Sequence, residues 1–183
     1  ELTPAERFHV EAVIIPDLRP AIDIVHGDYK VSHPLWLHLN AAPAHPMLCG
    51  TFKSVGRIEL PHHPVYPYGG TGFVVGRNLL MTNRHVAEIF ANGVGTRDLS
   101  FRPGLEAGVD FVKERGSTES AYLQVRKVLM IHPYWDMALL SVEGLKVDYP
   151  SLKLSLRASD ELRQQEVAVI GYPAFDPRNP ADV

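Results

Sequence analysis

The stretch that decides the fold is residues 69–86, which read G-G-T-G-F-V-V-G-R-N-L-L-M-T-N-R-H-V. Residues 72–75 and 79–82 are two apolar runs, and Gly76-Arg77-Asn78 between them is typical of a tight turn. We therefore expect two antiparallel strands joined as a hairpin. Residues 84–91 have room for one or two helical turns, which Asn92-Gly93 is expected to end.

The segments outside this hairpin also favour strands over helices. Alternating or β-branched runs predict strands at residues 21–25, 51–58, 107–113, 121–131, 137–142 and 166–170. Residues 41–46 and 61–64 are rich in proline and are expected to be loops. Thr3-Pro4-Ala5-Glu6 is a capping box with proline at the first helical position, which predicts a short N-terminal helix. Many short strands and few helices indicate an all-β barrel or sandwich.

The composition excludes several classes of protein. Hydrophobic residues make up 45% of the 183 residues and charged residues 21%, as in an ordinary soluble globular protein. The net charge of −3 gives no general reason to expect a nucleic-acid or membrane partner. No apolar run approaches the roughly 18 residues of a membrane span, and no stretch resembles a secretory signal.

Cysteine content and the first residue add two expectations. Cys49 is the single cysteine, which excludes an intrachain disulfide and a cysteine-rich zinc site. A cytoplasmic location is therefore favoured over a secreted one. The chain begins with Glu1 rather than Met, so we expect it to be a processed or excised piece.

Two residues are candidates for catalysis. His85 follows an apolar strand and opens a helical turn, a position that suits a general base. Asp136 stands between Tyr134-Trp135 and an apolar strand, where a carboxylate needs a partner. A surface or capping histidine and a loop-capping aspartate are the alternative interpretations.

A metal site is the other use of histidine that the sequence raises. His62 and His63 are adjacent, and His132 or Cys49 would have to join them to hold a metal. No H-E-x-x-H motif or close paired spacing supports this, so a solvated loop is expected, with no metal and no cofactor.

Three segments carry a family resemblance. Residues 70–75 with 80–86 resemble the strand-strand-helix segment around the catalytic histidine of trypsin-like serine peptidases. Residues 132–140, H-P-Y-W-D-M-A-L-L, are similar to that family's catalytic-aspartate segment. Residues 166–173, E-V-A-V-I-G-Y-P, resemble the strand that opens its second barrel, above all in bacterial glutamyl-endopeptidase-like members.

The resemblance implies a mechanism and a pair of roles. A serine hydroxyl is a poor nucleophile at neutral pH, so an imidazole must take its proton. His85 would be that general base and later the acid, and Asp136 would orient it and stabilise the imidazolium. His132, although it matches the pattern, is expected to be structural.

The sequence departs from the family at the nucleophile. The family's serine follows the aspartate in a G-x-S-G loop, and none of the serines after Asp136 stands in such a pattern: Ser141, Ser151, Ser155 and Ser159. Ser117 and Ser120 precede the aspartate and do not match either. We therefore expect no nucleophile in this chain, a serine on sequence beyond Val183, and no peptidase activity from residues 1–183 alone.

These expectations combine into a chymotrypsin-like double β-barrel whose first barrel is complete and whose second is only begun. Residues 1–68 would be an N-terminal extension with the first strands, residues 69–160 the first barrel, and residues 161–183 the start of the second. The expected function is a serine endopeptidase acting on polypeptides, with a C-terminal fragment or chain that carries the serine loop as partner. The alternative is a catalytically inactive, peptidase-like binding or regulatory module.

Overall fold

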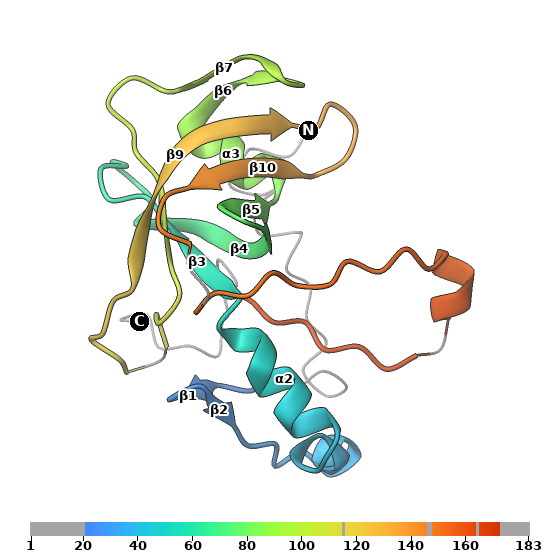
Figure 1. The fold of residues 1–183 in the computed structure, drawn as a ribbon. Helices are drawn as coiled ribbons and strands as arrows, with labels where there is room; N and C mark the ends of the chain where they lie inside the picture. Colours follow the sequence, from blue (N-terminus) through green and yellow to red (C-terminus); the bar gives the residue numbers. More distant parts are fainter. Residues whose placement is uncertain (1–20, 115, 146–147, 164, 173–183) are drawn as a thin grey trace.

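The computed structural model describes residues 21–114, 116–145, 148–163 and 165–172. Six antiparallel strands form one closed barrel in the order β10-β5-β4-β3-β8-β9 (Figure 1). The all-β barrel expected from the sequence is confirmed. The strands of the barrel are β3 (Val55–Glu59), β4 (Tyr68–Gly76), β5 (Leu79–Thr82), β8 (Gly108–Asp110), β9 (Tyr122–Ile131) and β10 (Ala138–Val142).

The β4–β5 hairpin confirms the turn chemistry of its sequence. Phe73 pairs with Met81 and Val74 with Leu80, so the two apolar runs lie side by side and antiparallel. Asn78 takes a φ of 57° in the connecting turn, a left-handed conformation that asparagine adopts more readily than most residues. The turn residue and the flanking β-branched residues thus favour the same structure.

Gly72 is a position at which the interior of the barrel has no room for a side chain. A methyl group added at Gly72 would lie 2.7 Å from Cδ2 of Leu80 and 2.8 Å from Cδ1 of Ile58. Both of these neighbours are fully buried in the core. The strands can therefore approach at this point only because position 72 is glycine. Other members of the core are Leu60, Val74, Val86, Phe90, Val109, Val125, Val128, Ile131, Ala138, Leu140 and Val142.

Helices and two small sheets flank the barrel. The helix α3 (Arg84–Phe90) follows β5 directly and leads into a two-stranded sheet of β6 (Ala91–Val94) and β7 (Arg97–Phe101). Asn92-Gly93, expected to end the helix, lies within β6 instead, because the helix already ends at Phe90. A second group lies together beyond the other end of the barrel (Figure 1). It comprises β1 (Ile24–Val25), β2 (Asp28–Tyr29), the 3-10 helix η1 (Pro34–Asn40) and α2 (Ala44–Phe52).

Part of this group corrects the sequence-based prediction. Residues 41–46 were expected to be a loop and residues 51–58 a strand, but α2 covers residues 44–52 and the strand begins only at Val55. The hydroxyl of Thr51 donates to the carbonyl of Met47 at 2.9 Å, the bond that a threonine makes with the preceding helical turn. The predicted strands at residues 21–25 and 107–113 form only over Ile24–Val25 and Gly108–Asp110.

The predicted strand at residues 166–170 is wrong, because these residues take no regular secondary structure. Val167 and Val169 are 79% and 95% exposed, so their apolar side chains have no surface to pack on. The segment is held at its two ends, where His38 contacts Glu166 at 2.9 Å and the Tyr172 amide donates to Thr71 Oγ1 at 2.7 Å. A short 3-10 helix, η2 (Ser159–Leu162), precedes it.

Three expectations are not tested by this fold. The predicted N-terminal helix lies outside the described residues, and the domain boundaries at residues 68 and 160 stay predictions. The second barrel also stays a prediction, because the described ranges contain one barrel. No helix within those ranges has the length and apolar character needed to cross a membrane.

The packing at Gly72 predicts a specific loss of stability. Gly72→Ala should lower the free energy of unfolding by about 1–3 kcal/mol, because the new methyl group overpacks the core. Gly50→Ala is the matched control, since Gly50 lies in α2 and an added Cβ there would meet nothing within 4 Å apart from its chain neighbours and the backbone of its own helix. It should stabilise the protein by about 0.5–1 kcal/mol through the helix preference of alanine. Urea denaturation of both variants measures the difference, and equal stabilities would contradict this account of the barrel.

Candidate active site

His85 is placed at the rim of the barrel by the way β5 ends. The buried hydroxyl of Thr82 donates to the Thr71 carbonyl at 2.7 Å, which fastens the last residue of β5 to β4. Helix α3 begins two residues later, and its residues Val86, Ala87 and Phe90 are buried against the core. His85 therefore lies in the first turn of a helix that is anchored on the core by its buried residues. Its own side chain is 35% exposed.

Asp136 is presented by the loop between β9 and β10. The ring nitrogen Nδ1 of His132 accepts hydrogen bonds from the amides of Tyr134 at 3.2 Å and Trp135 at 2.9 Å. The His132 ring also stacks on the indole of Trp135 with centroids 4.7 Å apart. His132 thus organises the loop from within, the structural role expected of it.

The structure brings His85 and Asp136 into direct contact. Nδ1 of His85 lies 2.7 Å from Oδ2 of Asp136, within hydrogen-bond distance. The backbone amide of His85 donates to the other carboxylate oxygen, Oδ1, at 3.0 Å. The same carboxylate therefore holds both the ring and the main chain of His85. A proton on Nδ1 suits this geometry, because the carboxylate can only accept.

This contact also completes the helix. Asn83 occupies the N-cap position of α3, but its side chain makes no capping hydrogen bond. Its amide donates instead to Oδ2 of Asp136 at 3.0 Å. The His85 amide, which a capping side chain would normally satisfy, is satisfied by Asp136, 51 residues away in sequence. Local folding of α3 and orientation of the histidine thus depend on one side chain.

Arg84 forms a second link between the helix and the loop. Its guanidinium donates to the carbonyl of Pro133 at 3.0 Å and lies 3.7 Å from the Glu88 carboxylate. Sequence reasoning missed both Asn83 and Arg84. The sequence did contain a signal for them. Asn83 and Arg84 are two polar residues between the apolar strand and His85, where their side chains are expected to lie outside the core and to contact neighbouring segments.

The surroundings of Asp136 favour its charged form. Partial burial is the largest single influence and would raise the pKa of Asp136. The hydrogen bonds from the His85 amide and ring, the charge of that ring, and the Asn83 amide together outweigh burial and hold the pKa below its usual 3.8. Asp136 is therefore ionised at neutral pH and can stabilise an imidazolium at His85.

The histidines proposed as an alternative metal site do not come together with their expected partners. His63 accepts hydrogen bonds from the amides of Val65 and Tyr66 and orders its own loop, and His62 lies 3.9 Å from Glu106. Within the described ranges, the side chains that gather as a candidate metal site are Asp28, His45 and Cys49. This group was not predicted, because His45 was expected in a loop, and only a helix places it one turn from Cys49.

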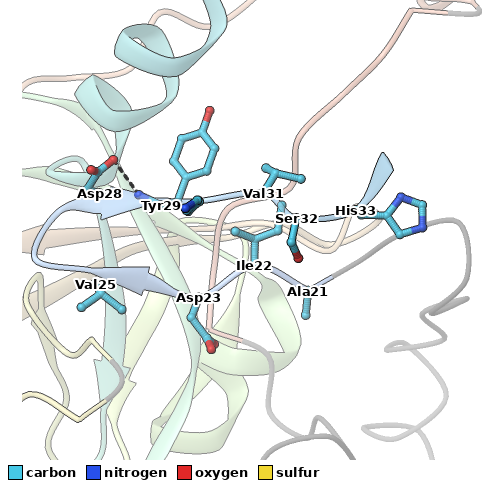
Figure 2. Close-up of a pocket in the computed structure, with 10 residues that line it drawn as sticks. Ala21, Ile22, Asp23, Val25, Asp28, Tyr29, Val31, Ser32 and His33 are labelled. Carbon is cyan, nitrogen blue, oxygen red and sulfur yellow. Dashed lines mark hydrogen bonds between the residues drawn. The ribbon is translucent and has the colours of Figure 1, made fainter. Parts of the chain in front are cut away.

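A cavity of about 450 Å³ is a separate feature. It is lined by residues of the segment 21–33, including Asp28 and Tyr29 of the β1–β2 hairpin, and neither His85 nor Asp136 takes part (Figure 2). The His85–Asp136 pair therefore lies outside this cavity.

The role of Asn83 can be tested through the pKa of Asp136. Asn83→Ala removes one donor to the carboxylate, so the pKa of Asp136 should move up toward 3.8. Carboxyl carbon NMR during an acid titration measures the shift. Asn92→Ala, an exposed asparagine in β6, should leave it unchanged. No movement in Asn83→Ala would contradict the proposed electrostatic role.

The same lowered pKa predicts a pH-dependent stability. Ionised Asp136 should stabilise the fold above its usual pKa of 3.8, and this contribution should be lost as the pH falls through the lower folded-state value. Chemical denaturation should therefore show that Asp136→Asn lowers the free energy of unfolding, relative to the parent protein, more at neutral pH than in acid. A loss of free energy that is the same at both pH values would show that the hydrogen-bond geometry matters and the charge does not.

Comparison with known proteins finds two proteins that are similar to parts of this chain. Exfoliative toxin A of Staphylococcus aureus is 32% identical over 116 residues, an alignment that covers 58% of this chain and 38% of the toxin. The chain thus spans under half the length of this curated relative. A solved structure titled as the inactive form of the Rv3671c protease is 22% identical to this chain. The match covers 61% of this chain and 41% of the solved chain, with a TM-score of 0.35.

A family profile covers more of the chain. The profile described as "Trypsin-like peptidase domain" matches residues 70–182, which include most of β4, all of α3 and β10, and the His85–Asp136 pair. The glutamyl-endopeptidase-like branch expected from the sequence is not distinguished by these comparisons and stays a prediction. The match extends over more than half of the 183 residues, and the chain therefore belongs to the trypsin-like peptidase domain family.

Proposed function

We propose that this chain supplies the histidine and the aspartate of a serine endopeptidase, with the nucleophilic serine on sequence outside residues 1–183. The observation that carries the proposal is the 2.7 Å contact between His85 Nδ1 and Asp136 Oδ2 in a member of the trypsin-like family. A carboxylate in this position keeps the proton on Nδ1 and leaves Nε2 to act as the base.

The proposed reaction follows from that assignment. Nε2 of His85 takes the proton of the serine hydroxyl as its oxygen attacks the carbonyl carbon of the scissile peptide. Asp136 stabilises the resulting imidazolium, which then gives its proton to the leaving amine, and an acyl-enzyme remains. A water molecule activated by the same His85 hydrolyses the acyl-enzyme and restores the serine.

The serines of the chain support an external nucleophile. The hydroxyl of Ser54 donates to the Pro150 carbonyl at 2.7 Å, and that of Ser120 donates to the buried carboxylate of Asp110. Both serve the packing of the barrel. No serine of the chain stands in a G-x-S-G pattern, in which the backbone amides beside the serine would also bind the oxyanion.

Two substitutions test the proposed roles in the natural protein that contains this chain. His85→Ala should lower kcat toward a polypeptide substrate by about 10⁶-fold and Asp136→Asn by about 10⁴-fold, as in comparable triads. His62→Ala is the matched control, because this exposed histidine contacts Glu106 and lies outside the pair. An active His85→Ala protein would refute the mechanism.

A covalent probe tests where the nucleophile is. We expect residues 1–183 alone to hydrolyse no peptide and to take up no fluorophosphonate, whereas the natural protein should be labelled on a serine in a G-x-S-G loop. Mass spectrometry of the labelled peptide identifies that serine. Labelling within residues 1–183 would overturn the external nucleophile. A natural protein that is inactive, unlabelled and indifferent to His85→Ala would favour the peptidase-like binding or regulatory module.

A further inference from the structure

Three side chains that can bind a metal meet outside the candidate active site. His45 and Cys49 lie one turn apart on the same side of α2, as residues i and i+4 of a helix do. Asp28 of β2 faces them, with its Oδ1 2.9 Å from Nε2 of His45 and 3.6 Å from the Cys49 sulfur. We propose that Asp28, His45 and Cys49 bind one Zn²⁺ ion.

The distances suit tetrahedral coordination. With zinc bonds of about 2.0 Å to oxygen and nitrogen and about 2.3 Å to sulfur, tetrahedral angles put the ligand atoms about 3.3–3.6 Å apart. The three separations here are 2.9 Å between oxygen and nitrogen, 3.6 Å between oxygen and sulfur, and 3.9 Å between sulfur and nitrogen. Each lies within about 0.4 Å of the tetrahedral value, so small side-chain movements would complete the site.

The donor set selects the metal. One thiolate, one imidazole and one carboxylate combine soft and borderline ligands, which favours zinc over magnesium or calcium. Binding converts the Cys49 thiol to a thiolate and releases its proton to solvent. Three protein ligands leave a fourth position for water. The ion can reach the site from solvent, because the side chains of Asp28 and His45 are 66% and 30% exposed.

Neighbouring groups already orient two of the ligands. Oδ1 of Asp28 accepts the Tyr29 amide at 2.7 Å, the contact drawn in Figure 2. The Tyr29 ring stacks on the His45 ring with centroids 4.8 Å apart, and its hydroxyl donates to the Leu39 carbonyl. Outer contacts of this kind fix ligand orientation in metal sites.

A bound ion would fasten the β1–β2 hairpin to α2. The contacts that join them here are those of side chains partly exposed to solvent, which contribute little stability individually. A zinc ion would replace them with three coordinate bonds between segments 17 to 21 residues apart in sequence. The proposed site uses no residue of the barrel and does not depend on the peptidase mechanism.

Metal titration of the 183-residue chain tests the site. We expect one Zn²⁺ per chain by calorimetry, and Co²⁺ in its place should give the near-ultraviolet absorption of a thiolate-bound ion. Cys49→Ser and His45→Ala should each weaken zinc binding by about 100-fold or more, since even the loss of an outer contact costs about 10- to 100-fold. His62→Ala/His63→Ala, which removes the other histidine pair, should bind zinc like the parent.

A measurement on the unaltered chain keeps the proposal testable if a variant fails to fold. Zinc should slow the reaction of Cys49 with a thiol reagent, because the sulfur would be coordinated. Zinc bound without thiol protection and without the cobalt–thiolate absorption would overturn the site, as would equal binding by a folded Cys49→Ser variant. Loss of zinc binding in the His62/His63 double variant would place the ion elsewhere and refute the proposal.

Discussion

The carboxylate of Asp136 is the group on which the candidate site depends. It accepts the His85 amide at 3.0 Å and contacts the His85 ring at 2.7 Å, so it satisfies a helix end and orients an imidazole at once. Asn83 adds a third hydrogen bond and Arg84 ties the loop to the helix through Pro133. A half-buried carboxylate needs such donors to remain charged. The dependence is therefore mutual: amides at the start of α3 stabilise the charged carboxylate, and the carboxylate satisfies a helix-terminal N–H that would otherwise lack an acceptor.

Rigidity at this place comes from both sides of the contact. On one side, α3 is packed on the core through Val86 and Phe90. On the other, the His132 ring accepts two amides of its own loop and holds Trp135 against its face. The proposed catalytic role requires the two side chains to be held within a fraction of an ångström of the working geometry. The packing of α3 on the core and the hydrogen bonds within the His132 loop favour this.

The sequence predicts those parts of the fold in which local preference and tertiary packing agree. The β4–β5 hairpin follows from its apolar runs and an asparagine in the turn. The places of His85 and Asp136 beside apolar strands make them candidates, and their pairing and roles are what the family resemblance implies. The prediction fails where a pattern has two interpretations. Thr51 and Phe52 extend an alternating run, yet they finish a helix whose start after Pro43 is hidden by a proline-rich composition. Residues 166–170 have the composition of a buried strand, but a strand also needs a neighbouring strand, and composition does not supply one.

Contacts between distant residues are not encoded in any local pattern. Asn83 contacts Asp136 across 53 residues, and Asp28 contacts His45 and Cys49 across 17 and 21 residues.

The contact between Gly72 and Leu80 has a consequence for how this barrel can vary among related sequences. Every replacement of Gly72 adds a Cβ that would meet the Leu80 side chain at 2.7 Å, so position 72 cannot change alone without straining the core. A smaller residue at position 80 would remove one of the two close contacts of that Cβ, and the contact with Ile58 at 2.8 Å would remain. Gly72 pairs with Thr82 and Leu80 pairs with Val74, so the two positions are diagonal neighbours across β4 and β5. Their side chains would be in contact, and their effects on stability should therefore be non-additive. Natural variation at these sites is expected to be coupled, with a larger residue at position 72 accompanied by smaller residues at positions 58 and 80.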